Sequence, residues 1–239
     1  MQNLKITIIG NSVSLRTRPV EKHPDNKNYG KLLEEFLCQN ASDKNIVINN
    51  KATGAYTVYN VLTKIDDFVN TFPDYYIINL GVVDASTREI PLWFYRLASS
   101  KKKGFVYKLL SFFYRGLIIK ARPAFVKLRG KRSWISSKKY RKYFSHLVKT
   151  LIKETNAKII VMPINPANNR VEKELPGSLK NHLLYTKLMK DISLEFSQHF
   201  LELNNLNSEE HYPDGVHYSI SGHNVVAQEL GKIILKENN

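Results

Sequence analysis

The stretch "LKITIIGNSVS" (residues 4–14) is an apolar run, typical of a buried strand, that ends in Gly10-Asn11-Ser12. Two interpretations fit this ending. In the first, Gly10 relaxes the backbone of an ordinary strand-to-helix turn and Ser12 caps the helix that follows. In the second, Ser12 is a nucleophile held at the carboxyl edge of a sheet. Residues about two hundred positions away decide between the two.

Runs with the composition of buried strands alternate with runs whose apolar residues recur at helical spacing. The strand-like runs are residues 4–10, 45–49, 74–81, 157–163 and 199–204. The helical runs are residues 29–38, 56–72, 140–155, 179–196 and 221–237. Because alternating strands and helices join through right-handed crossovers, the order predicts an α/β fold with a parallel sheet of about five strands, covered on both faces.

The length and composition of the chain are typical of a globular protein. The 239 residues suffice for one large domain, and the single cysteine, Cys38, cannot form an internal disulfide. The first ten residues lack the pattern of a secretory signal, and no apolar run approaches the length of a membrane span. We therefore expect one domain over residues 1–239, located in the cytoplasm.

The net charge of +15 is concentrated in one segment. Residues 88–142 hold 17 Lys and Arg against one acidic residue, Glu89, while the remainder is close to neutral. The segment overlaps a break between the third and fourth predicted strands that is too long for a normal crossover. We name residues 86–139 the basic insertion. Its predicted helix, which Pro123 is expected to end, has an apolar face made of Phe105, Val106, Leu109, Leu110, Phe113 and Leu117.

Three interpretations of the basic insertion remain open. It could cover the site as a helical lid with solvated charges. It could dock on an anionic membrane surface through residues 101–142, which would make the protein peripheral to the inner face of the membrane. It could also bind an anionic polymer or a nucleotide-linked substrate, with Trp93, Tyr95 and Trp134 stacking on sugars. Nucleic acid is disfavoured because the chain has no recognised binding motif.

The residues that follow the predicted strands form a set suited to acyl transfer, because ligands bind at the carboxyl ends of strands in such sheets. Ser12 follows the first strand, Gly54 the second, and Asp214 stands three residues before His217 after the last. A serine hydroxyl needs a base to take its proton, and a histidine base needs a carboxylate on its other nitrogen. The amides of Ser12 and Gly54 could then stabilise an oxyanion.

These segments resemble the four conserved blocks of the SGNH (GDSL-like) hydrolases over nearly the full chain. The matching segments are "IIGNSVS" (8–14), "ATGAYT" (52–57), "LGVVD" (80–84) and "DGVHYSISGHNVVAQEL" (214–230). The resemblance implies a flavodoxin-like three-layer α/β/α sandwich with Ser12 as nucleophile, His217 as base and Asp214 as its orienting partner. It also implies an oxyanion hole at the Ser12 and Gly54 amides, and activity without a metal or other cofactor.

The chain departs from the family pattern at two positions. Asn11 replaces the aspartate of Gly-Asp-Ser, and Val83 replaces the third-block asparagine, whose loss as an oxyanion donor would lower the rate by about a hundred- to a thousand-fold. Variants encoded with bacterial surface-polysaccharide genes resemble this chain in lacking that asparagine. Asn11 or Asn165 could substitute as donor. Asp84, Arg88 and Asn165 are the candidate substrate-binding residues, and for Asp84 and Arg88 the alternative is a surface ion pair.

Two functions therefore compete. The first is a serine esterase or O-acyltransferase acting on an acylated carbohydrate or a lipid-linked glycan. The alternative is a catalytically impaired SGNH-like protein that binds a glycan, an anionic polymer or a membrane surface. Val83 favours the alternative, whereas retention of Ser12, Asp214 and His217 favours catalysis.

Overall fold

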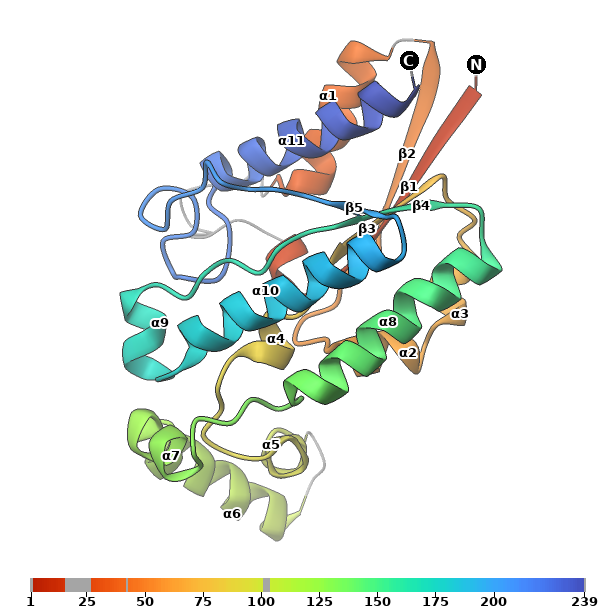
Figure 1. Cartoon of the computed structure of the whole chain (residues 1–239). Helices are drawn as coiled ribbons and strands as arrows, with labels where there is room; N and C mark the ends of the chain where they lie inside the picture. The colour runs from red at the N-terminus through yellow and green to blue at the C-terminus, as the bar shows by residue number, and fades with distance from the viewer. Residues whose placement is uncertain (1, 16–26, 42, 101–103, 239) are drawn as a thin grey trace.

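The sheet at the centre of the molecule is parallel throughout and has five strands in the order β2-β1-β3-β4-β5 (Figure 1). The computed structural model describes residues 2–15, 27–41, 43–100 and 104–238. The strands are β1 (Gln2–Gly10), β2 (Lys44–Asn50), β3 (Tyr75–Asn79), β4 (Lys158–Val161) and β5 (His199–Phe200). The predicted parallel α/β fold is confirmed, although the last predicted strand shortens to two residues.

Helices cover both faces of the sheet and give the three layers that the family resemblance implies (Figure 1). One layer consists of α1 (Tyr29–Asn40) and α11 (Ile220–Asn238), which pack on each other. The other consists of α2 (Val58–Leu62), α3 (Asp66–Val69), α8 (Ser137–Glu154) and α10 (Ser178–Glu195). Within the described residues, no helix is both long enough and apolar enough to cross a membrane.

The central strands are mostly apolar where both of their faces are buried. Ile6, Ile8 and Ile9 of β1 have no exposed surface, and every residue of β3 is buried. The carboxyl ends of β1 and β3 lie next to each other, with Gly10 paired to Asn79. Polar residues that follow these strands therefore meet at one edge of the sheet.

The basic insertion carries its own helices and a small core of its own. Its helices are α5 (Leu92–Ala98), α6 (Phe105–Phe113), a π-helical turn (Tyr114–Ile118) and α7 (Arg122–Leu128), which lie together apart from the sandwich (Figure 1). The core consists of Ile90, Ala98, Tyr114 and Ile118. The two ends of the insertion meet where Thr87 bridges Ser133.

Pro123 does not end the predicted helix as expected. It lies in the first turn of α7, where a missing amide hydrogen removes no helical hydrogen bond. The predicted helical face is also not a packed face. Leu110 packs on the small core, but Phe105, Val106, Leu109, Phe113 and Leu117 are exposed.

The loop before α11 is held in place by a close approach to the helix backbone. The amide of Ser219 donates to the carbonyl of His211 over 2.9 Å. The same carbonyl oxygen lies 2.2 Å from the position that a Cβ atom on Gly222 would occupy. Only glycine fits there, and the loop between these residues contains Asp214 and His217.

We expect Gly222→Ala to lower the free energy of unfolding by about 1–3 kcal/mol, because a methyl group would have to displace backbone rather than a flexible side chain. Urea unfolding followed by circular dichroism measures the change. Gly116→Ala is the matched control, since nothing lies within 4 Å of its added Cβ, and it should leave the midpoint unchanged or slightly raised. Equal midpoints for Gly222→Ala and the unmodified protein would contradict this packing.

Candidate active site

Ser12 lies at the carboxyl edge of the sheet because β1 runs directly into a short 3-10 helix, Ser12–Ser14. The side chain of Asn11 caps that helix by accepting a hydrogen bond from the Val13 amide over 3.0 Å. Gly10 allows the turn to close tightly, since a Cβ there would lie 2.3 Å from the Ser14 hydroxyl oxygen. The predicted capped turn exists, but the cap is Asn11 and not Ser12, and the Ser12 hydroxyl instead faces a histidine.

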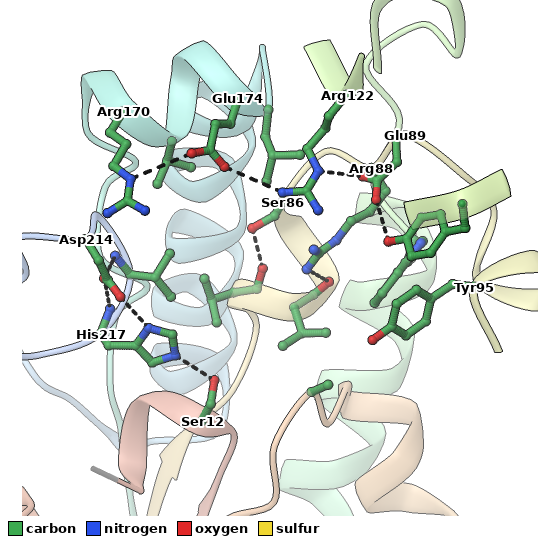
Figure 2. A pocket seen from close by; sticks show the side chains of 18 residues that line it. Ser12, Ser86, Arg88, Glu89, Tyr95, Arg122, Arg170, Glu174, Asp214 and His217 are labelled. Carbon is green, nitrogen blue, oxygen red and sulfur yellow. Dashed lines mark hydrogen bonds and ion pairs between the residues drawn. The ribbon is translucent and has the colours of Figure 1, made fainter. Parts of the chain in front are cut away.

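His217 joins Ser12 and Asp214 into one chain of hydrogen bonds (Figure 2). Its Nε2 lies 2.9 Å from the Ser12 hydroxyl oxygen, and its Nδ1 lies 2.7 Å from Oδ2 of Asp214. An ionised carboxylate can only accept, so Nδ1 carries the proton and Nε2 is free to take one from Ser12. The three residues named from the sequence thus converge, although 205 positions separate Ser12 from His217.

Asp214 also fixes the backbone that carries the histidine. Its Oδ1 accepts from the amide of Val216 over 2.8 Å and from the amide of His217 over 2.7 Å. Burial acts to raise the pKa of Asp214, but the hydrogen bonds from His217 and Val216 outweigh it and hold that pKa below its ordinary value. Asp214 therefore stays ionised at neutral pH, as a partner of an imidazolium must.

A pocket of about 390 Å³ opens beside these three residues and extends to the basic insertion. Residues from the strand ends, from α9 (Asn169–Glu174) and from the insertion contribute to its wall. Its lining comprises Ser12, Ala55, Val82, Val83, Ser86, Arg88, Glu89, Tyr95, Tyr114, Arg122, Trp134, Arg170, Val171, Glu174, Leu175, Asp214, Val216 and His217. Trp93 does not line this pocket, whereas Tyr95 and Trp134 do.

Charged side chains on the far wall of the pocket pair with one another (Figure 2). Arg122 lies 3.6 Å from Glu89 and 3.5 Å from Glu174, and Glu174 is also 3.7 Å from Arg170. The hydroxyl of Tyr114 donates to Glu89 over 2.7 Å. These residues were not identified from the sequence, because no local motif connects residue 89 to residues 122 and 174.

Arg88, by contrast, has no carboxylate partner among the described residues. Its guanidinium group packs over the ring of Trp134 at 4.2 Å and makes a long, 3.4 Å hydrogen bond to the Val83 carbonyl. Burial lowers the pKa of Arg88. Arg88, a substrate-binding candidate in the sequence, is thus a pocket cation that makes no direct ion pair within the described residues, although the neighbouring carboxylate of Glu89 acts on it electrostatically.

A family model described as GDSL-like lipase/acylhydrolase matches residues 6–230. The chain belongs to this family. The match confirms the family that the four sequence blocks indicated. Members of this family hydrolyse ester bonds. No curated relative matches the sequence significantly.

Solved structures of the same fold cover almost the whole chain. The acetylxylan esterase Axe2 from Geobacillus stearothermophilus is 19% identical, covers 96% of this chain and 93% of its own, and gives a TM-score of 0.63. LAE5, an α/β hydrolase enzyme from the metagenome of Lake Arreo in Spain, is 17% identical, covers 95% and 93%, and gives a TM-score of 0.62. At these identities the two structures establish the shared fold.

The second block of the GDSL-like family lies at the mouth of the pocket. Gly54 is exposed, and its amide makes no hydrogen bond within the described residues. Ala55, which lines the pocket, has a φ of 60°, a left-handed conformation that few alanines adopt. The Ser12 amide begins the 3-10 helix and likewise has no backbone acceptor. Two amides are therefore available near the serine.

The other residues considered as substitute donors are sealed away from the pocket. Asn11 has no exposed surface, and its amide nitrogen is buried without a hydrogen-bond partner among the residues that the structure describes. Asn165 is also buried and donates to the carbonyl of Val216 over 3.1 Å, while its own carbonyl accepts from Nδ1 of His182. Neither side chain lines the pocket, and Asn165 instead holds the loop that carries His217.

Asp84 lies beneath the pocket rather than in it. The third-block helix α4 (Val82–Ala85) buries its carboxyl group completely, and Oδ1 accepts from the amide of Val58 at the start of α2 over 3.1 Å. Burial raises the pKa of Asp84 to about 8, against the opposing effect of the Val58 hydrogen bond. Asp84 therefore anchors α2 and is largely protonated at neutral pH. No three His, Cys, Asp or Glu side chains in the described part of the chain could hold a metal ion.

We expect Asp84 to make stability pH-dependent, because its folded-state pKa lies above its ordinary value of 3.8. The contribution of the neutral Asp84 carboxyl to the free energy of unfolding is complete below pH 3.8. It is lost as the pH rises toward about 8. Asp84→Asn keeps an acceptor for Val58 and abolishes the ionisation. Urea unfolding measures the free energy of unfolding of both proteins at pH 5 and pH 8. From pH 5 to pH 8, the difference in that free energy should shift in favour of the variant by on the order of 2–4 kcal/mol.

Asp66→Asn is the control, because Asp66 is an exposed aspartate in α3. Its free energy of unfolding should change between pH 5 and pH 8 in the same way as that of the unmodified protein. If Asp84→Asn and the unmodified protein lost stability in parallel, the carboxyl of Asp84 would be ionised in the folded state.

Proposed function

We propose that this protein is a serine esterase that removes acyl groups from an acylated carbohydrate, with Ser12 as nucleophile, His217 as general base and Asp214 as the orienting carboxylate. One observation carries the proposal: an unbroken chain of hydrogen bonds runs from Asp214 through His217 to Ser12 at the end of an open pocket. A surface ion pair would not require a serine hydroxyl within reach of the second ring nitrogen.

The reaction then proceeds in two halves. The Ser12 hydroxyl oxygen attacks the acyl carbonyl carbon while His217 Nε2 takes the hydroxyl proton, and the resulting imidazolium is stabilised by Asp214. Collapse of the tetrahedral intermediate breaks the ester C–O bond, and His217 returns the proton to the departing sugar oxygen. Water repeats the sequence on the acyl-serine, which releases the carboxylic acid and restores Ser12.

The Ser12 and Gly54 amides are the proposed donors to the oxyanion, since neither is used by the backbone around it. Val83 lines the pocket, and the family places its third donor at this position. A two-donor hole is consistent with an esterase of reduced rate rather than with an inert protein, because each donor contributes separately.

The carbohydrate part of the proposal rests on the pocket wall and on the printed activity of a structural neighbour. Tyr95 and Trp134 present aromatic surface, and Arg88 offers a cation for a polar or anionic group of the substrate. Axe2, which shares the fold, is an acetylxylan esterase. Whether water or a sugar hydroxyl accepts the acyl group would distinguish an esterase from an O-acyltransferase.

We expect Ser12→Ala to abolish labelling by a fluorophosphonate probe and to lower kcat/KM for 4-nitrophenyl acetate by about 10⁴–10⁶, because the nucleophile is lost. Asp214→Asn should lower kcat by about 10⁴, since the amide no longer fixes the histidine tautomer. Ser86→Ala is the control: Ser86 lines the same pocket, but its hydroxyl lies 2.9 Å from Nε2 of His182 rather than near His217.

The Ser86 variant should keep the labelling. Absence of labelling in the unmodified protein would contradict catalysis and favour the alternative of a binding protein. Release of acetate from acetylated xylo-oligosaccharides tests the substrate class separately, because a serine esterase of another specificity would still react with the probe.

We expect Val83→Asn to raise kcat for 4-nitrophenyl acetate by up to about a hundred-fold, because it restores an amide donor where the oxyanion forms. The control is Val82→Asn, which places the same amide one residue earlier in the pocket wall. A folded Val83→Asn protein with unchanged kcat would indicate that this side chain does not reach the oxyanion.

A further inference from the structure

The outer face of the basic insertion exposes large apolar side chains that the active site does not use. Those on α5, α6 and the π-helical turn form what we call the docking face: Trp93, Leu97, Phe105, Val106, Leu109, Phe112, Phe113 and Leu117. Phe105 is 81% exposed and Phe112 is 74% exposed, and no residue of α6 is buried. Soluble surfaces rarely gather so many such side chains unless something binds there.

The docking face is not simply the reverse side of an incomplete core. The opposite side of the same helices, with Ala98, Leu110, Tyr114 and Ile118, already packs into the small core of the insertion. A groove of about 640 Å³ runs between α5 and α6, with Trp93, Leu97, Tyr107 and Arg96 among its lining residues. Apolar surface and a basic group therefore occur in the same groove.

The basic insertion also carries exposed positive charge without ion-pair partners. Five exposed basic residues of the insertion make no ion pair with a carboxylate in the described part of the chain: Arg96, Lys108 and Arg115 on the helices of the docking face, Lys120 in the following turn and Lys127 on α7. The sequence contains no acidic residue between Ile90 and Lys153. A second copy of this chain would bring the same charges against these, so self-association through this face is disfavoured.

From this combination we propose that the docking face binds the surface of an anionic lipid bilayer. The aromatic and aliphatic side chains enter the boundary between head groups and acyl chains, and Arg96, Lys108 and Arg115, which lie on the same helices, contact lipid phosphates. Apolar burial and charge attraction act together, whereas a soluble polyanion would use only the charge.

The geometry also relates this surface to the pocket. Tyr95 and Tyr114, which line the pocket, belong to α5 and the π-helical turn that carry the docking face. A bound bilayer would therefore lie about one helix diameter, ~10 Å, from the pocket wall. If the proposed esterase function holds, this position suits an acylated glycan attached to a lipid, but lipid binding itself does not depend on catalysis.

Vesicle sedimentation with the full chain tests the proposal. The vesicles are phosphatidylcholine alone or phosphatidylcholine with 30% phosphatidylglycerol, at about 50 mM and 500 mM NaCl. We expect the protein to sediment with the anionic vesicles at low salt, to dissociate substantially at high salt, and to remain in solution with phosphatidylcholine alone. Failure to sediment with anionic vesicles at low salt would overturn the proposal and leave the esterase assay unaffected.

Paired variants test the two components. Phe105→Ser with Phe112→Ser removes apolar side chains, and its control is Phe72→Ser with Leu194→Ser, at residues 66% and 65% exposed elsewhere on the molecule. Lys108→Glu with Arg115→Glu reverses two charges, and its control is Lys149→Glu with Lys187→Glu on α8 and α10. Each insertion variant should bind anionic vesicles at least about tenfold more weakly than its control.

Two further results would overturn the proposal. If the control with reversed charges lost binding as strongly as the insertion variant, net charge rather than this face would be responsible. If the unmodified protein were a dimer by light scattering, and Phe105→Ser with Phe112→Ser made it monomeric, a second copy would be the occupant of the face.

Discussion

The carboxylate of Asp214 is the group on which the arrangement of the site depends. One oxygen accepts two successive backbone amides and the other accepts the imidazole, so a single side chain sets both the path of the loop and the direction of the ring. The loop is itself fixed near His217 by the hydrogen bond from Asn165 to the Val216 carbonyl, and at its ends by the hydrogen bond from the Ser219 amide to the His211 carbonyl. Since Ser12 directly follows β1, a small displacement of this loop would separate the His217 ring from the Ser12 hydroxyl.

The fold could be predicted because its central strands are buried on both faces over much of their length, which makes them rich in apolar residues up to the polar or glycine residues at their ends. The meeting of Ser12, His217 and Asp214 could be predicted for a related reason, since parallel strands bring such endings together. The boundaries of the helices were harder to predict from the sequence. The predicted helix over residues 56–72 is divided into α2 and α3, and its apolar spacing continues through the turn that separates them. Periodicity therefore gave no sign of the division.

The remaining site residues depend on partners that only the folded chain brings near. Asp84 and Arg88 stand four positions apart in sequence, yet Asp84 on α4 is buried beneath the pocket and Arg88 faces the pocket. Asn165 was considered as an oxyanion donor, but its amide is committed to a backbone carbonyl 51 positions away. The pairing of Glu89 with Arg122 likewise depends on how α7 folds back over residue 89. Local sequence carries no signal for any of these contacts.

Charge is distributed so that the two sides of the basic insertion behave differently. On the pocket side, Arg122 is balanced by Glu89 and Glu174, so substrate meets a wall with little excess charge apart from Arg88. On the outer side no carboxylate is near in sequence, and the positive charge acts on the surroundings without opposition. Because the sandwich itself is nearly neutral, an anionic surface would attract the molecule with the insertion foremost. The excess of positive charge on the outer side of the basic insertion would then also bring the pocket wall, which the insertion helps to form, close to that surface.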